Sequence, residues 1–203
     1  ARAFAFVAST GAACIMLTGL APELLPGTPA LTLNILRNSL GLFSGALALR
    51  YLGLWMGVAA EDRMVRHTVR WGSRAQFVAG CTMVFLTLWR PTEESQRLLA
   101  TTAALNGLFV LLPVVATMRA IALGDQLAKG ILGASVLLAC MVIGLYAHGL
   151  GIALGMFVWA LTAVCTIGFF MVGTYLGLRR ARFSRGLVRL AGLARNDDQA
   201  TGL

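Results

Sequence analysis

Long apolar runs separated by short polar stretches make up most of this chain. Six runs qualify as membrane-crossing segments, at about 4–21, 39–60, 76–90, 98–118, 127–147 and 150–178. A helix needs roughly 20 mostly apolar residues to cross the hydrocarbon core, and these runs are continuous, unlike the alternating strands of a membrane barrel. The pattern therefore predicts an all-α, polytopic membrane bundle of about six transmembrane helices over residues 1–178, with seven helices as the second choice.

Two tryptophans frame the third run. Trp71 and Trp89 are separated by 18 positions, which corresponds to about 27 Å along a helix. Indole rings favour the two membrane interfaces, and this distance matches one bilayer core. The spacing therefore supports a crossing helix here.

Composition agrees with a membrane environment. Of the 203 residues, 58% are hydrophobic and 12% are charged, whereas a soluble domain has about 45–50% apolar and about 25% charged residues. The net charge of +9 could indicate nucleic-acid binding. Basic residues of membrane proteins, however, collect on the cytoplasmic side and meet anionic lipid there. We therefore expect the lipid bilayer, and not nucleic acid, as the partner.

Basic residues fall mainly on one side of the predicted bundle. With the N-terminus inside, three lie in external segments, Arg37, Arg90 and Arg97, and Arg50 lies within the second run. Basic flanks resist translocation, so the asymmetry predicts that both ends are cytoplasmic. The thirteen residues of the predicted cytoplasmic segments are Arg2, Arg63, Arg66, Arg70, Arg74, Arg119, Lys129, Arg179, Arg180, Arg182, Arg185, Arg189 and Arg195.

Polar residues within or near the runs are candidates for ligand binding. Arg50 is costly inside a span, so we expect it to face the bundle interior, bonded to neighbouring helices or paired with an anionic ligand or lipid headgroup. Arg37 and Asn34, with Asn38, would form an external polar mouth. Asn106 adds an amide within the fourth run. Each of these also fits the alternative of hydrogen bonds that hold helices together.

Residue patterns typical of enzymes and metal sites are missing from the sequence. His67 and His148 fall in loops that the topology places on opposite sides of the membrane. No acidic residue lies within a run, which argues against proton-coupled transport, and serine-nucleophile and HExxH patterns are missing. We expect no catalytic residue, metal or cofactor. The cysteines lack paired spacing and are expected to be small buried hydrophobes; they are Cys14, Cys81, Cys140 and Cys165.

Small residues and one proline shape the predicted helices. Pro113 should bend the fourth helix beside Asn106 and could line a cavity there. Glycines spaced by four let helices approach closely, either within the chain or at a dimer seam. The four pairs are Gly41/Gly45, Gly53/Gly57, Gly151/Gly155 and Gly173/Gly177.

Residues 179–197 are basic and amphipathic and predict a short cytoplasmic stalk helix. Apolar positions recur at alternating spacings of four and three, as in a coiled-coil seam. An interfacial helix on anionic lipid is the alternative, since Gly186 and Gly192 lower helix propensity. The seam would join two copies in parallel, together with Gly173 and Gly177. Its positions are Leu176, Arg180, Phe183, Leu187, Leu190 and Ala194.

The last residues carry a family resemblance. Asp198, Thr201, Gly202 and Leu203 match the D-x-L-T-G-L that opens GGDEF domains, the diguanylate cyclase family, and Ala200 departs from the usual leucine. Residues 198–203 thus resemble the start of an output domain whose remainder would follow Leu203. The resemblance implies a bacterial inner-membrane sensor controlling cyclic di-GMP synthesis through paired catalytic domains. No catalytic residue of that family falls within this chain.

Two classes of function remain open. The first is a sensory module that binds a small hydrophobic or anionic ligand in the bundle and signals through a dimeric stalk. The second is an accessory or structural subunit of a larger membrane complex, with a small transporter or channel less favoured.

Overall fold

The computed structural model describes the backbone of residues 2–53, 62–90, 92–153 and 155–201, and the side chains of 5–53, 62–90, 93–153 and 155–179. The regular structure of these residues is helical, which confirms the all-α prediction. Two elements are short, α2 (Ala21–Leu24) and the 3-10 helix η2 (Thr92–Glu94). The long helices are α1 (Arg2–Leu17), α3 (Ala30–Gly53), α4 (Arg63–Trp89), α5 (Ser95–Ala122), α6 (Ala128–Gly149) and α7 (Met156–Thr201).

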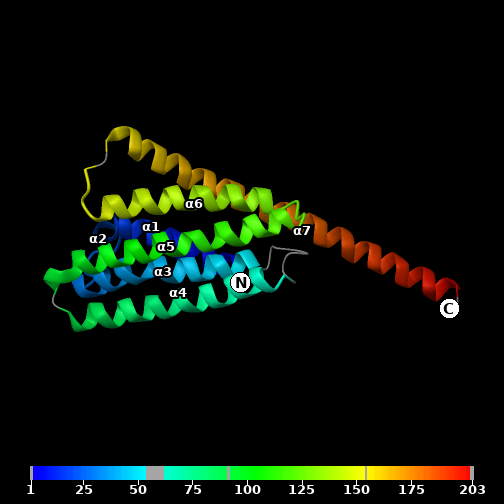
Figure 1. Ribbon diagram of the computed structural model, residues 1–203, viewed down its shortest axis with the longest axis horizontal. Coiled ribbons are helices and arrows are strands. Elements are labelled where there is room, and N and C mark those ends of the chain that lie inside the picture. The colour runs from blue at the N-terminus through cyan, green and yellow to red at the C-terminus, as the bar shows by residue number, and fades with distance from the viewer. Residues whose placement is uncertain (1, 54–61, 91, 154, 202–203) are drawn as a thin grey trace.

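The long helices run side by side in alternating directions (Figure 1). Helix α3 packs against α1, α4 and α5, whereas α6 packs against α5 and α7. The start of α1 lies beside the end of α3, because Phe6 stacks on Tyr51 with ring centroids 5.8 Å apart. We call the end of the bundle where α3 and α5 stop and α4 and α6 start the stalk end, because α7 projects from it (Figure 1). The opposite end is the far end.

Three of the helices are long and apolar enough to cross a membrane. They are Ser95–Ala122, Ala128–Gly149 and the Met156–Arg179 part of α7, with hydropathies of 2.0, 2.2 and 2.0. Helix α1 has only 16 residues, and α3 and α4 do not qualify among the described residues. The structure therefore supports membrane contact by three helices and does not establish six crossings.

Several predicted boundaries are wrong. Helix α4 begins at Arg63 and not near 76, because its four arginines lower the hydropathy of a segment that is nonetheless helical. Helix α3 begins at Ala30, nine residues before the predicted run, and the rest of that run, 54–60, lies outside the described residues. Helix α7 begins at Met156 and not at 150.

The two histidines are helical, and not in loops as predicted. His67 lies in the first turns of α4, where its Nδ1 is 3.0 Å from the Arg63 carbonyl oxygen. His148 lies in the last turn of α6 and contacts the Trp159 ring of α7, with centroids 4.4 Å apart. They remain at opposite ends of the bundle, as expected.

The bundle buries polar side chains within a mostly apolar core, and it exposes large apolar side chains on its outside. Large side chains such as Trp89, Met156 and Phe157 are 76%, 91% and 79% exposed. Water would not favour such a surface, whereas lipid would. The buried polar side chains are Thr10, Asn38, Ser39, Ser44, Gln76, Thr87, Thr102, Asn106, Thr117, Ser135 and Thr162.

The expected burial of the cysteines is wrong for most of them. Only Cys165 is buried, and Cys14 is half-buried, while Cys81 and Cys140 are exposed on the outer surface. A thiol is a small apolar group, and the outside of a membrane bundle accepts such a group as readily as the core does.

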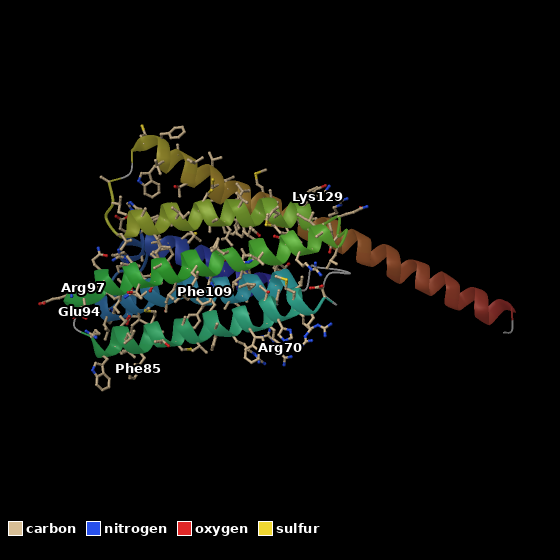
Figure 2. All side chains as sticks on the ribbon, viewed as in Figure 1. Arg70, Phe85, Glu94, Arg97, Phe109 and Lys129 are labelled. Atoms are coloured by element: carbon tan, nitrogen blue, oxygen red, sulfur yellow. The ribbon has the colours of Figure 1, made fainter. Side chains whose placement is uncertain are left out.

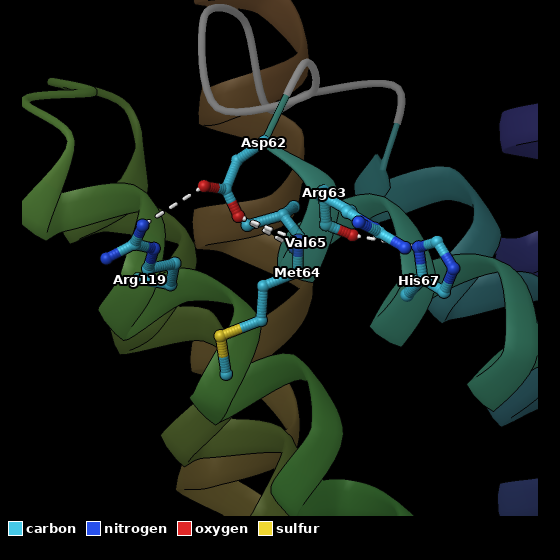
Figure 3. A network of polar contacts seen from close by, with 6 residues as sticks. All are labelled: Asp62, Arg63, Met64, Val65, His67 and Arg119. Carbon is cyan, nitrogen blue, oxygen red and sulfur yellow. Dashed lines mark hydrogen bonds and ion pairs between the residues drawn. The ribbon is translucent and has the colours of Figure 1, made fainter.

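Asp62 ties α4 to α5 at the stalk end (Figure 3). Its carboxylate caps α4 by accepting from the backbone N–H groups of Met64 and Val65, at 3.0 and 3.1 Å. The Arg119 guanidinium lies 3.2 Å from its other oxygen. The Val65 N–H, with Arg119 and the Met64 N–H in support, holds the pKa of Asp62 below its ordinary value. The joint therefore combines a helix cap with an ion pair.

Candidate functional site: a cavity among the six long helices

A layer of buried hydrogen bonds joins the helices across the interior. The Thr102 hydroxyl donates to the Asn38 carbonyl at 2.8 Å, and the Asn38 amide lies 3.3 Å from the Thr87 hydroxyl. These contacts connect α3 to α4 and α5. Thr10 of α1 and Ser44 of α3 share a 2.6 Å bond. Buried polar groups of this kind fix the register of neighbouring helices because each needs its own partner.

Asn106 belongs to this layer. Its Nδ2 donates to the Tyr146 hydroxyl of α6 at 2.7 Å and is 3.3 Å from the Thr102 carbonyl. The side chain is 3% exposed. The alternative of a hydrogen bond between helices is thus what the structure shows for Asn106, while its role toward a ligand stays a prediction.

Gly41 and Gly45 make room for polar side chains of other helices. A Cβ on Gly41 would collide with the Tyr146 hydroxyl and would lie 3.2 Å from Asn106 Nδ2. A Cβ on Gly45 would collide with the Gln76 amide. This glycine pair therefore serves packing within the chain, the first of the two uses expected for it.

An apolar cavity of about 340 Å³ lies among the long helices, within the size range of small-molecule pockets, roughly 300–1,000 Å³. Helix α5 contributes Pro113, so the expected cavity wall at this proline is confirmed, and Phe109, which lies midway along α5 (Figure 2). A second cavity of about 50 Å³ shares some of the lining. Further lining residues of the larger cavity include Phe6, Leu49, Leu138, Phe169, Gly173 and Leu176.

The larger cavity reaches the surface between α1 and α7. Val7 of α1 and Leu178 of α7 are 49% and 58% exposed, and Thr174 of α7 is exposed as well. The remaining lining residues are buried or half-buried. An opening between two helices on the apolar outer surface faces the lipid phase.

Gln76 lies in the wall of both cavities. Its side chain is 3% exposed, and its Oε1 has no hydrogen-bond partner. Sequence reasoning missed this residue because it was placed at the edge of the third run. A lone amide followed by Phe77 and Val78 could have signalled an inward-facing polar position.

The predicted site residues do not gather at this cavity. Arg50 is exposed on α3, so the expectation that it faces the interior is wrong, because its side chain lies on the same outward face of the helix as the exposed Leu47. Arg37 is half-buried and its guanidinium donates to the Gly149 carbonyl, which caps the end of α6. Asn34 lies one turn before Arg37 on the same helix and lines neither cavity. Ligand binding by Arg50, Arg37 and Asn34 stays a prediction.

Leu176, the first position of the predicted dimer seam, packs inside the bundle. Leu176 is 4% exposed, lines the cavity and packs over Gly130 of α6, so it is occupied within the chain. Gly173 and Gly177 are half-buried and also line the cavity. The backbone of 179–197 is helical as predicted and continuous with α7. The side chains of Phe183, Leu187 and Leu190 lie outside the described ones.

The described residues hold no group of three or more His, Cys, Asp or Glu side chains that could bind a metal ion. No family model, curated protein or solved structure matches this chain.

Proposed function

We propose that this chain is a membrane sensory module that converts occupancy of its cavity into a movement of α7. One observation carries the proposal: α7 is a single helix from Met156 to Thr201 that lines the cavity with one part and leaves the bundle with the rest. A continuous helix transmits a displacement along its length, because its backbone hydrogen bonds resist local bending.

Helix α7 is placed to respond to a ligand. Its main packing partner is α6, while its other side borders the cavity. A ligand that binds one position of α7 more tightly than another shifts the population toward that position. The output would then depend on how two stalks meet below the bundle.

The proposed topology has six crossings with both ends cytoplasmic, in the inner membrane of a bacterium. The distribution of charge along the bundle supports it: Arg70 and Lys129 lie at the stalk end, whereas Glu94 and Arg97 lie at the far end (Figure 2). Reporter fusions at Arg66 and Leu203 should report cytoplasm, and a fusion at Glu94 should report periplasm. A periplasmic signal at Leu203 would contradict this topology.

The proposed output is a paired GGDEF-type domain after the stalk, as the resemblance at Asp198, Thr201, Gly202 and Leu203 implies. The active unit is then a homodimer with a two-fold axis along the membrane normal. Reading the gene beyond the codon for Leu203 tests this directly, since a GG-[DE]-E-F loop should follow.

Transmission is tested by joining a catalytic cyclase domain after Leu203 and inserting one to seven residues in the stalk. Cyclic di-GMP production should rise and fall with the helical period of about 3.6 residues, because each residue rotates the output domain about the stalk axis. A fusion after a transmembrane bundle without a continuous exit helix is the control. Production that is independent of insertion length would favour the accessory-subunit alternative.

A further inference from the structure

The unpartnered amide of Gln76 indicates what the cavity binds. Its Oε1 is buried without a hydrogen-bond partner, which native proteins seldom tolerate. The hydroxyls of Ser135 and Thr174, which also line the cavity, already donate to the Ile131 and Phe170 carbonyls of their own helices. These oxygens can still accept a bond, but among the described lining residues it is Gln76 whose buried side chain holds an acceptor without any partner.

Water fits the larger cavity poorly, whereas the smaller one, which Thr10, Ser44, Asn106 and Tyr146 also line, is polar enough to hold it. A buried water molecule needs two to four polar partners, whereas apolar cavities of this kind stay dry and take apolar guests. The walls around Gln76 are supplied by side chains such as Val110, Leu138 and Leu49. An occupant of the larger cavity that meets Gln76 must therefore combine an apolar body with one group that can donate a hydrogen bond.

The shape of the lining adds a constraint. On α7 it extends from Phe169 to Leu178, nine residues that rise about 14 Å. Gln76 lies in the buried wall, and the exposed mouth is formed by Val7, Thr174 and Leu178. The site is long, and its polar group is away from the entrance.

We propose that the cavity binds an elongated apolar molecule carrying one hydroxyl group, of the class of long-chain alcohols, which enters from lipid between α1 and α7. The hydroxyl donates to Oε1 of Gln76, and the chain lies along the α7 wall. The terminal torsion of a glutamine is soft, so its amide can turn to meet the hydroxyl. Binding does not depend on the signalling role; only the claim that occupancy is the signal rests on the proposed function.

The test uses two photoreactive probes, a diazirine-bearing hexadecanol and its methyl ether, with the full chain in phosphatidylcholine nanodiscs. The alcohol should label cavity residues about tenfold more than the ether, the ratio expected for one hydrogen bond. Gln76→Leu should bring this ratio to about one. Gly173→Leu should abolish labelling by both probes, because nothing lies within 4 Å of a Cβ at Gly173 and the new side chain would enter the cavity.

Gly107→Leu is the matched control. A Cβ at Gly107 also meets nothing within 4 Å, and the residue is exposed and lines neither cavity, so labelling should be unchanged. Equal labelling by alcohol and ether in the parent chain would overturn hydroxyl recognition and leave a cavity that accepts any acyl chain. Labelling that survives Gly173→Leu would overturn the cavity as the binding site.

A second measurement tests whether the Gln76 amide has a structural role instead of binding a ligand. Without probe, Gln76→Leu should be at least as thermally stable as the parent chain, because it removes an unpaired buried acceptor. A clear loss of stability would mean that the amide has a structural partner, and would overturn its assignment to a ligand. Alcohol binding without a change in cyclic di-GMP production by the fusion would reject the signalling role while retaining the site.

Discussion

Helices α3 to α6 and helix α7 belong to one bundle but are held by different kinds of contact. Side-chain hydrogen bonds cross between α3, α4, α5 and α6, as from Asn106 to Tyr146 and from Ser73 to the Ala46 carbonyl. The described threonines of α7, Thr162, Thr166 and Thr174, instead donate to carbonyls of α7 itself. Up to residue 179, where its described side chains end, α7 is therefore attached mainly by apolar packing, and its hydroxyl groups do not bond to other helices.

This difference has a consequence for motion. Hydrogen bonds are directional and must break before a helix can slide, whereas apolar contacts depend mainly on area and tolerate small shifts. The region with polar cross-links suits a rigid frame, and α7 suits a moving part. The cavity lies where the two meet.

The largest expected effect concerns the frame. Gly41→Leu would drive a side chain into Tyr146 and Asn106, and should destabilise the bundle by the upper part of the roughly 1–3 kcal/mol that overpacking costs, or more. The measurement is SDS-induced unfolding in mixed micelles. Gly107→Leu, in open space, should unfold close to the parent. Similar losses of stability for both variants would show that replacing any helical glycine destabilises the bundle, and that the space Gly41 leaves for Tyr146 is not the cause.

The next effect tests the polar layer. Asn106→Leu leaves the buried Tyr146 hydroxyl without the amide that now donates to it, and should cost about 1–3 kcal/mol. Adding Tyr146→Phe should recover part of this loss, because both partners are then apolar, and a double-mutant cycle measures the coupling. Strictly additive losses would mean that the two residues do not act together.

A smaller effect measures the spacing of α7 from the frame. The thiols of Cys140 on α6 and Cys165 on α7 lie close to one another, so copper-phenanthroline oxidation should join them within one chain. Mass spectrometry of the peptides reads the yield, and Cys81 on α4 is the internal control. The long-chain alcohol should change this yield several-fold. An unchanged yield with the probe bound would place α7 in the rigid frame.

Hydropathy predicted the helices that are apolar along most of their length. The fourth and fifth runs, 98–118 and 127–147, lie within a few residues of α5 and α6. Hydropathy failed to predict the start of α4, because its first turns carry four arginines, Arg63, Arg66, Arg70 and Arg74. Their spacings of three and four residues fit one side of a helix, and Asp62 before them is a helix-capping signal. Both signals outweigh hydropathy in fixing where this helix starts.

The candidate site was less predictable for a physical reason. Whether a polar residue faces a cavity depends on which neighbours leave space, as Gly45 does for Gln76. That information lies in residues far apart in the sequence. Arg37 and Arg50 stood out by charge, yet one caps a helix end and the other is exposed. The free-energy cost of a charged side chain within a membrane identified these residues as unusual, but it did not indicate what they do.

The smallest expected effect is electrostatic and concerns the joint between α4 and α5 within the frame. Asp62→Asn keeps an oxygen that can cap α4 but removes the charge that meets Arg119. Because the folded-state pKa of Asp62 is lowered from 3.8, its carboxylate adds stability above that pH, and the contribution is lost as the pH falls through the folded-state pKa. The variant should therefore melt slightly below the parent at pH 7, and the difference should be smaller at an acid pH below 3.8. Melting curves in detergent at both pH values measure this, with Glu93→Gln, at an exposed acidic position, as the control. A difference that is the same at both pH values would assign the effect to the lost cap geometry and would remove the charge from the joint.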